Sequence, residues 1–550
     1  QNIRSSRAPP SPTLCLLFPF PWPLPAQPVA SMLTNSEKLQ REPRTESADD
    51  SNDSLSTSAL PPADHCYFVW FIMYLQGVGA LFPWNAFITP VDYFQLRFEG
   101  SSFKSSFESI FTTTFTLMGI LTIIALQWGQ EYVSVSTRIK GSLVLLLLVF
   151  AVVTLLAVLP LFKSDDTFLE SLSDGAGFQF GILELCVGLS GMAVAVLTGS
   201  VTSYSSIYGS GAYIQAVVGG QGIAGLTVSL GNMLRSVPSV SNDCAGTQSD
   251  QLAHDREVVT GAAIYFGASC FVLFCCLVSF IHVEKIPFTR ACLKQSEGLP
   301  PSPTMPSATD MDGMLLQRAS GSSRLGSVPL LNHAACGEEA PEPYTQLAAL
   351  AAPPRLARTL WKWCLSMTLI YTVTIALFPS LTANIESTGS GIAGQSDCLW
   401  SNPKSGLFGP FLFVMFNLGD TIGRNLPPSL SRVNVILALV ACRVVFVPLF
   451  ILCKSNSDDP LLPSLLNSSD AFPILVMLVF AVSNGWLTSC IFVHSASVVS
   501  PELRQRACTF IVLFLNSGLS IGAMLSFFTR WLMCRCSCNP FLAPNASAVN

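Results

Sequence analysis

Charged side chains are scarce in this chain. Asp, Glu, Lys and Arg together make up 11% of its 550 residues, whereas a soluble globular domain carries about 25%. Hydrophobic residues account for 50%, so the composition is that of a membrane protein and excludes a soluble domain. The formal net charge of -5 is small, and no basic field predicts binding to nucleic acid.

Patterns typical of catalytic and metal sites are also missing. The sequence contains no HExxH and no paired aspartates within an apolar run, so no acid, base and nucleophile gather to predict an enzyme. The 18 cysteines lack the paired spacing of a zinc site. Many of them lie in apolar runs, where a cysteine behaves as a small hydrophobic residue. We therefore expect no enzyme activity, no metal and no cofactor.

Long apolar runs are abundant instead. A helix needs about 20 apolar residues to cross the hydrocarbon core of a bilayer, and the chain holds eleven such runs, six before and five after a long polar stretch. We predict an all-α polytopic membrane protein. The expected spans are residues 66–88, 108–128, 141–162, 177–203, 212–234, 258–282, 360–383, 406–427, 433–453, 472–495 and 507–532.

The segments between and around the spans differ in composition. Residues 1–31 are rich in proline and begin with Gln, and we interpret them as an upstream read-through or a non-native leader. Residues 32–65 predict a disordered cytosolic tail, and residues 283–357, rich in Pro and Ser, a disordered cytosolic loop. The remaining segments are a six-helix bundle, a five-helix bundle and a short extracytosolic tail, at 66–282, 358–532 and 533–550.

The basic residues near the span ends predict the orientation. Lys and Arg are more frequent on one side if the amino terminus is cytosolic. An odd number of spans then leaves the carboxyl terminus outside. Two Asn-X-Ser sequons, at Asn467 and Asn545, fall on that outer side, where glycan acceptors must lie. We expect both asparagines to be glycosylated.

Two opposite charges stand inside one predicted span. Asp420 and Arg424 lie in the run 406–427, and residues four apart share one face of a helix. Each charge alone would cost about 2.5–3.5 kcal/mol at the bilayer centre on insertion scales. A pair can neutralise itself and still offer donors and acceptors to a polar solute or an ion, which favours a transporter. The alternative is a structural pair that ties two helix bundles together, and it does not exclude a substrate role.

Other polar and aromatic groups lie at membrane depth. Pro83 kinks the first span and frees a backbone carbonyl, while Trp84 and Asn85 add an aromatic face and a buried amide. This combination suits a planar heterocycle, although Trp84 could equally belong to the aromatic belt at the membrane surface. Gln221 is an amide that needs a partner or a substrate. Arg443, near the middle of the ninth span, favours a structural role.

Short motifs follow one another along the spans: Pro83-Trp84-Asn85, Ser206 to Gly209, Gly220 to Gly225, Phe378-Pro379, Phe416 to Asp420 with Gly423-Arg424, and Ser483-Asn484-Gly485. In this order they resemble the equilibrative nucleoside transporter family (solute carrier family 29). The resemblance runs from about Tyr67 to Trp531, apart from the polar loop. It implies a fold similar to the major facilitator class, with a pseudo-symmetric six-plus-five arrangement. It also implies facilitated, alternating-access passage of nucleosides, with nucleobases as further candidate substrates, down the gradient or with protons.

The resemblance further implies a role for single residues. Arg424 would contact the ribose hydroxyls and Asp420 would orient it, since a guanidinium fork suits such acceptors. An apolar, partly aromatic wall for the base would come from Leu81, Trp84 and Ile88. The remaining residues expected to contact the substrate are Tyr204, Ser206, Gln221 and Asn417, and those expected to be structural are Pro83, Asn85, Arg443 and Asn484.

Two of these positions bear on the choice of substrate. Tyr204 is matched with a position where many relatives carry Gln, and a phenol cannot make the two-point contact of an amide, which puts purine preference in doubt. The neutral Gln221 stands where the organic-cation branch has an acid, which disfavours monoamine cations. We expect a nucleoside substrate and the lipid bilayer as partners.

The sequence alone does not decide between this function and two alternatives, or between two membranes. The chain could be an organic-cation or other small-solute carrier, or a membrane scaffold or receptor that acts through its 283–357 loop. Asp312 to Leu316 in this loop resembles an acidic dileucine sorting signal. Family members occur at the plasma membrane and in vacuolar or lysosomal membranes, and both remain possible locations.

Overall fold

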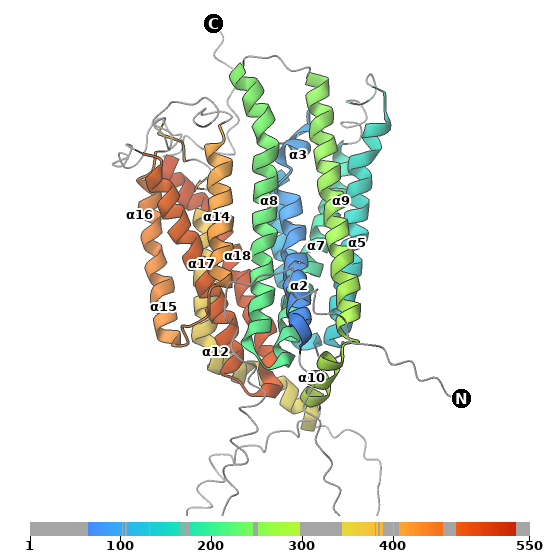
Figure 1. Cartoon of the computed structure of the whole chain (residues 1–550), viewed down its shortest axis with the longest axis vertical. Coiled ribbons are helices and arrows are strands. Elements are labelled where there is room, and N and C mark those ends of the chain that lie inside the picture. The colour runs from blue at the N-terminus through green and yellow to red at the C-terminus, as the bar shows by residue number, and fades with distance from the viewer. Residues whose placement is uncertain are drawn as a thin grey trace, which may run out of the picture.

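The computed structural model consists of long helices that run side by side between two ends of the molecule (Figure 1). The proposed leader, most of the amino-terminal tail, both sequons and the dileucine-like segment lie outside the described residues. The structure describes residues 64–534 except 102, 105–106, 131, 165–167, 169–175, 246–250, 298–343, 380, 383–384, 389–399, 401–405 and 455–468.

In the described residues, six long helices precede the loop and five helical segments follow it. The first six are α2 (Phe68–Ile88), α4 (Phe107–Gly129), α5 (Val135–Val158), α7 (Ala176–Ser205), α8 (Gly211–Ala245) and α9 (Gln251–Val283). The later five are α12 (Tyr344–Leu377), α14 (Phe408–Asn425), α15 (Val433–Cys442) with its continuation α16 (Phe446–Ile451), α17 (Ala471–Ser497) and α18 (Arg504–Cys534). Shorter elements include η2 (His65–Tyr67), α3 (Val91–Arg97), η3 (Leu159–Phe162), η4 (Ser206–Tyr208), α10 (Pro287–Glu297), η6 (Arg443–Val445) and η7 (Pro501–Leu503).

Ten helical segments in the described part of the chain are long and apolar enough to cross a membrane. Together they confirm the predicted all-α polytopic fold. The remaining predicted span, 406–427, corresponds to α14, which is not among the ten. This helix carries both Asp420 and Arg424 and packs against α8 and α17. Its polar residues lower its hydropathy, but burial between two other helices shields them from lipid.

Glycine residues permit close contact between several of these helices. A Cβ atom added at Gly220 of α8 would overlap the backbone carbonyl of Tyr74 in α2. One added at Gly485 of α17 would overlap the backbone carbonyl of Asp420 in α14. Small residues let the backbones of membrane helices approach one another. Here they let α8 pack closely against α2, and α17 against α14, the helix that carries the charged pair.

The predicted loop and tail boundaries need correction. Residues 287–297 form α10, although the composition of the 283–357 segment predicts disorder throughout. Pro287 starts this helix, as proline often does at a first helical position. The Phe288 ring stacks on the Tyr208 ring, with centroids 5.5 Å apart, and the Tyr208 and Thr289 hydroxyls are 3.3 Å apart. Docking against η4 therefore stabilises a helix that composition alone does not reveal.

The two bundles also begin earlier than predicted. Asp64, expected in the amino-terminal tail, is buried and accepts hydrogen bonds from the Val69 amide at 3.0 Å and the Tyr213 hydroxyl at 3.0 Å. The α12 helix starts at Tyr344, within the expected loop. Its first turns are rich in Ala and Leu, which favour helix. The first bundle thus includes Asp64, and the second extends back to Tyr344.

A carboxylate fixes the end of the second half that lies away from α10. Asp470, which immediately precedes α17, is fully buried. Its Oδ1 accepts from the Thr388 amide at 2.7 Å and the Thr388 hydroxyl at 2.9 Å. Its Oδ2 accepts from Ser387 Oγ at 2.7 Å and Trp400 Nε1 at 2.8 Å. Burial alone would raise the pKa of Asp470, but these hydrogen bonds outweigh it and lower the pKa below its ordinary value of 3.8.

We expect Asp470→Asn to lower the free energy of unfolding by about 1.5–3 kcal/mol, because an amide nitrogen cannot accept the bonds that one carboxylate oxygen accepts. A depressed folded pKa stabilises the fold above the unfolded value and loses this effect as the pH falls through the folded value. Thermal unfolding in detergent between pH 3 and pH 7 should show the difference between wild type and variant shrinking towards pH 3. Glu386→Gln is the control, since the Glu386 carboxylate is partly exposed and makes a weak ion pair with Lys454 at 4.0 Å. Equal losses in the two variants would contradict the prediction.

Candidate substrate site at Asp420 and Arg424

The charged pair predicted from the sequence is formed and buried. Arg424 Nε donates to Asp420 Oδ2 at 2.6 Å, and the side chains are 5% and 9% exposed, respectively. Both residues lie on α14, four positions apart, as the helical repeat predicts. Removing two charges from solvent is costly unless further hydrogen bonds satisfy them. The surrounding helices supply those bonds.

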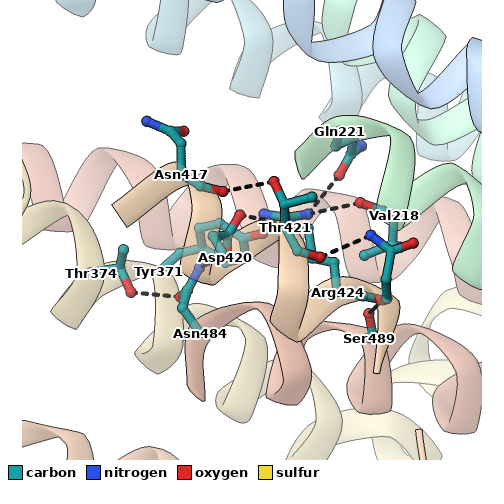
Figure 2. Close-up of polar contacts among 11 residues, drawn as sticks. Val218, Gln221, Tyr371, Thr374, Asn417, Asp420, Thr421, Arg424, Asn484 and Ser489 are labelled. Carbon is teal, nitrogen blue, oxygen red and sulfur yellow. Dashed lines mark hydrogen bonds and ion pairs between the residues drawn. The ribbon is translucent and has the colours of Figure 1, made fainter. Parts of the chain in front are cut away.

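Arg424 also contacts α8 and α12. Its Nη1 donates to Gln221 Oε1 at 3.1 Å and to the Val218 carbonyl at 3.4 Å, both on α8. Its Nη2 donates to the Tyr371 hydroxyl on α12 at 3.2 Å. Figure 2 shows Gln221 and Val218 approaching the guanidinium from the α8 side. One arginine of the second half thus holds both a helix of its own half and a helix of the first.

Asp420 is the start of a second chain of polar contacts. Its Oδ1 accepts from Asn484 Nδ2 at 2.7 Å, and Asn484 Oδ1 accepts from the Thr374 hydroxyl at 2.7 Å (Figure 2). The Thr374 oxygen accepts in turn from Arg443 Nη2 at 3.0 Å. Both oxygens of the Asp420 carboxylate therefore have donors. Asn484 fixes the carboxylate that fixes Arg424.

Arg443 is a second buried cation near the pair. Its Nη1 donates to the Phe480 carbonyl at 2.8 Å and to the Ser483 hydroxyl, and its guanidinium carbon lies 4.4 Å from the centre of the Phe480 ring. A carbonyl, two hydroxyls and a ring face thus stabilise its charge. These contacts bind η6 to α12 and α17. The structural role predicted for Arg443 and Asn484 remains a prediction, and these contacts are consistent with it.

The end of α14 is fixed from both halves. Gln215 of α8 donates through Nε2 to the carbonyls of Leu426 at 2.7 Å and Arg424 at 3.3 Å. Ser489 of α17 donates to the same Arg424 carbonyl at 2.8 Å. The last carbonyls of a helix have no partner within the helix. Here they take donors from neighbouring helices, which fixes the turn that carries Arg424.

Three of these neighbours escaped the sequence analysis. Gln215, Tyr371 and Ser489 all contact Arg424 or its backbone. A usable signal was present on α12, where Tyr371 and Thr374 are three residues apart in an apolar run and therefore on one face. For Gln215 and Ser489 the sequence offers no comparable pattern, because a single polar residue in a span does not name its partner.

Asn417 lies on the same helix as the pair but makes a local bond. Its Nδ2 donates to the Phe413 carbonyl of α14 at 2.9 Å. Its Oδ1 is the atom closest to where a Cβ on Gly225 of α8 would lie. One turn on, Thr421 Oγ1 donates to the Asn417 carbonyl at 2.7 Å and faces Gly222 of α8. Asn417 is thus at the α8–α14 contact, about one turn of helix from Asp420.

The residues expected to wall the base lie on α2. Leu81 packs against a small apolar cluster that includes Ala224, three residues after Gln221. The Trp84 ring lies 4.5 Å from the Phe115 ring of α4, and Ile88 is 39% exposed. The structure thus places Leu81 near the turn of α8 that carries Gln221. It brings neither Trp84 nor Ile88 into a hydrogen bond or ring contact with the pair, as far as the described residues go.

Pro83 and Asn85, expected to be structural, lie within the same helix. Pro83 is buried, and α2 continues past it to Ile88. Asn85 Nδ2 donates to the carbonyl of Leu81 at 3.2 Å. That carbonyl is one turn earlier in α2, so the amide closes a local bond. The structural role of both residues remains a prediction.

Tyr204 and Ser206 lie elsewhere. The Tyr204 ring packs against the rings of Phe280, at 5.1 Å, and Tyr208, at 6.1 Å. Ser206 Oγ donates to the Ser203 carbonyl at 2.7 Å. These contacts are at the end of α7 near α10, because Tyr208 itself stacks on Phe288 of α10. No contact between described residues brings either side chain to Arg424, so their substrate role stays a prediction.

Helices of membrane length surround a buried, hydrogen-bonded ion pair, and both halves of the chain contact this pair. This is the architecture of a polytopic membrane transport protein. The model of the family described as "Nucleoside transporter" matches residues 185–531. This range includes Gln221, Asp420 and Arg424. The chain belongs to this nucleoside transporter family.

Curated relatives match along nearly their whole length. The chain is 28% identical over 500 residues to equilibrative nucleoside transporter 2 of Mus musculus, covering 86% of this chain and 99% of the relative. It is 28% identical over 511 residues to equilibrative nucleoside transporter 1 of Rattus norvegicus, covering 87% and 100%. It is 25% identical over 505 residues to equilibrative nucleoside transporter 4 of Homo sapiens, covering 85% and 84%. The resemblance inferred from the motifs is confirmed.

Solved structures are more distant. The proton:xylose symporter XylE of the major facilitator superfamily shares 10% identity and a TM-score of 0.47 with this chain, over 85% of this chain and 88% of that one. The assignment of the chain to the nucleoside transporter family rests on the family match and not on this likeness.

Proposed function

We propose that the protein is an equilibrative transporter that moves nucleosides across a membrane by alternating access. The observation that carries this proposal is the position of Arg424. Its guanidinium is buried, is held by Asp420 and bridges to Gln221 in the first half of the chain. A polar solute that binds this guanidinium and weakens its bond to Gln221 would couple binding to a looser contact between the halves. Binding of that kind couples a substrate to a change of conformation.

The distribution of contacts between the halves supports alternating access. Gln127 Nε2 of α4 donates to the Thr509 carbonyl of α18 at 3.4 Å, and Thr509 Oγ1 donates to the Gly199 carbonyl of α7 at 3.5 Å. Gln127 and Gly199 lie within about two turns of the ends of α4 and α7, and Gln215 and Thr509 within about two turns of the starts of α8 and α18. Such contacts, broken together, would separate these helix ends while Arg424 stays bound to Asp420.

The proposed roles of single residues follow from their placement. Arg424 donates to the hydroxyls of the sugar, and Asp420 holds the guanidinium in position. Leu81 contributes an apolar surface next to the turn that carries Gln221. Trp84 and Ile88 complete the wall for the base on α2. A nucleoside matches both the polar and the apolar part of this site, because its sugar is polar and its base is flat and largely apolar.

Transport should be tested with the full chain in proteoliposomes. We expect saturable uptake of tritiated uridine and adenosine that stops when internal and external concentrations are equal. Preloading with unlabelled uridine should speed the entry of label, as expected of a carrier that returns loaded. Absence of saturable flux of both nucleosides from folded protein would overturn the proposal. Uptake of an organic cation in that case would support the small-solute alternative.

The same vesicles distinguish proton linkage and membrane of residence. Uptake is compared at pH 5.5 and pH 7.4, with and without an inward proton gradient. We propose a plasma-membrane or a vacuolar/lysosomal location. A higher rate of uptake at pH 5.5 than at pH 7.4 would favour the membrane of an acidic compartment. Uridine accumulated above its external concentration under the gradient would indicate proton linkage. Uracil as a third substrate tests whether nucleobases are also carried.

A further inference from the structure

The guanidinium of Arg424 has one more donor than the structure uses. An arginine side chain carries five N–H groups. Four hydrogen bonds are formed with described residues, through Asp420 Oδ2, Gln221 Oε1, the Val218 carbonyl and the Tyr371 hydroxyl. Nε and Nη1 account for three of them. The remaining N–H is on Nη2, the nitrogen that also donates to Tyr371.

Tyr371 supplies a second donor at the same place. Its oxygen accepts from Nη2 at 3.2 Å, so its own O–H proton is available for another acceptor. Among the residues that the structure describes, no hydrogen bond takes up this proton. The side chain is only 7% exposed, and a buried O–H without an acceptor is unfavourable. Two adjacent donors, one from each residue, thus lack an acceptor within the described part of the chain.

The packing of α12 fixes the Tyr371 side chain. A Cβ atom on Gly518 of α18 would lie 3.0 Å from the Tyr371 Cβ and 2.5 Å from the Thr368 carbonyl. Only a glycine permits α18 to approach α12 this closely. The base of the Tyr371 side chain is therefore packed closely against α18 while its hydroxyl reaches Arg424. A side chain fixed in this way is suited to select between ligands that differ by one group.

We propose that Tyr371 is a specificity-determining residue, whose hydroxyl and Arg424 Nη2 together bind the sugar hydroxyls of a nucleoside. This inference rests on the proposed function. Both residues belong to the second half of the chain, so this edge of the site stays intact when the halves separate. The bonds of Nη1 to α8, in contrast, join the halves. The sugar is thus held by one edge of the guanidinium while the other edge opens and closes.

The test compares Tyr371→Phe with wild type on three substrates: uridine, 2′-deoxyuridine and 3′-deoxyuridine. The variant keeps the ring and removes the hydroxyl. We expect the KM for uridine to rise about 3–10-fold, as for the loss of one hydrogen bond, with little change in maximal rate. The deoxy analogue that lacks the hydroxyl bound by Tyr371 should lose almost nothing. The preference of wild type for uridine over that analogue should therefore disappear in the variant.

Tyr93→Phe is the matched control, because Tyr93 is a buried tyrosine of α3 packed against Phe94 and Phe266, away from the site. A variant that affects all three substrates equally would show that Tyr371 merely positions Arg424, and would overturn the proposal. An unchanged KM for uridine would also overturn it. Failure of the proposed function looks different, since wild type itself would then carry no nucleoside.

Discussion

Uptake of uridine by Arg424→Ala is expected to fall at least 100-fold per folded molecule. The substitution removes the donors proposed for the sugar, and hydrogen bonds to a charged group contribute about 1.5–3 kcal/mol each. Two such bonds exceed the roughly 2.7 kcal/mol that corresponds to a factor of 100. The substitution also removes the bonds to Gln221 and Tyr371. Initial rates in proteoliposomes, normalised to folded protein by size-exclusion chromatography, measure the effect.

A loss of folded protein must be separated from a loss of transport. Arg424→Ala leaves Asp420 buried and without its cation, which typically costs about 3–5 kcal/mol. The double variant Asp420→Asn/Arg424→Gln removes both charges and keeps hydrogen-bonding groups of similar size. We expect it to restore the yield of folded protein without restoring uptake. Uridine transport at more than a tenth of the wild-type rate by either variant would contradict the role assigned to Arg424.

The sequence predicts best what depends on local spacing. Asp420 and Arg424 are four residues apart in one helix, so their contact follows from the helical repeat alone. Ten of the eleven predicted spans follow from the length of apolar runs, whereas α14, with its charges, is not among the helices of the described residues that are long and apolar enough to cross a membrane. The need of Gln221 for a polar partner was also visible, since an amide at membrane depth must form hydrogen bonds.

Contacts between distant segments could not be predicted in the same way. Asn484 reaches Asp420 from 64 positions away, and Tyr371 reaches Arg424 from 53. Nothing local fixes which helices become neighbours. The matched motif at Ser206 suggested a substrate contact for Tyr204, which stays a prediction, but it did not reveal that this ring packs against Phe280. A motif identifies a segment of helix, whereas helix packing decides where each of its side chains points.

Composition was misleading where a short helix lies within a polar stretch. Averaged over the 283–357 segment, Pro, Ser and Gly predict disorder. The eleven residues of α10 nevertheless form a helix, because Phe288 and Thr289 contact Tyr208 in the first bundle. Short helices gain most of their stability from packing. Their existence therefore depends on a partner surface that the segment itself does not encode.

The second large effect is expected from one methyl group on α8. Gly220→Ala would place a Cβ atom against the backbone carbonyl of Tyr74, which cannot move aside as a flexible side chain can. Overpacking of this kind costs about 1–3 kcal/mol. A separation of α8 from α2 would also displace Gln221, the next residue, from its 3.1 Å bond to Arg424. We expect both a lower melting temperature and slower uridine uptake.

Gly231→Ala, on the same helix, is the matched control. No atom lies within 4 Å of the position of its Cβ in the described part of the structure, apart from its own helix and chain neighbours. It should raise the free energy of unfolding by up to about 1 kcal/mol, because alanine favours helix over glycine. Thermal unfolding of both variants in detergent, with uptake measured beside it, separates steric overlap from helix propensity. If Gly220→Ala were as stable and as active as Gly231→Ala, the close α2–α8 contact could not be what holds Gln221 at the ion pair.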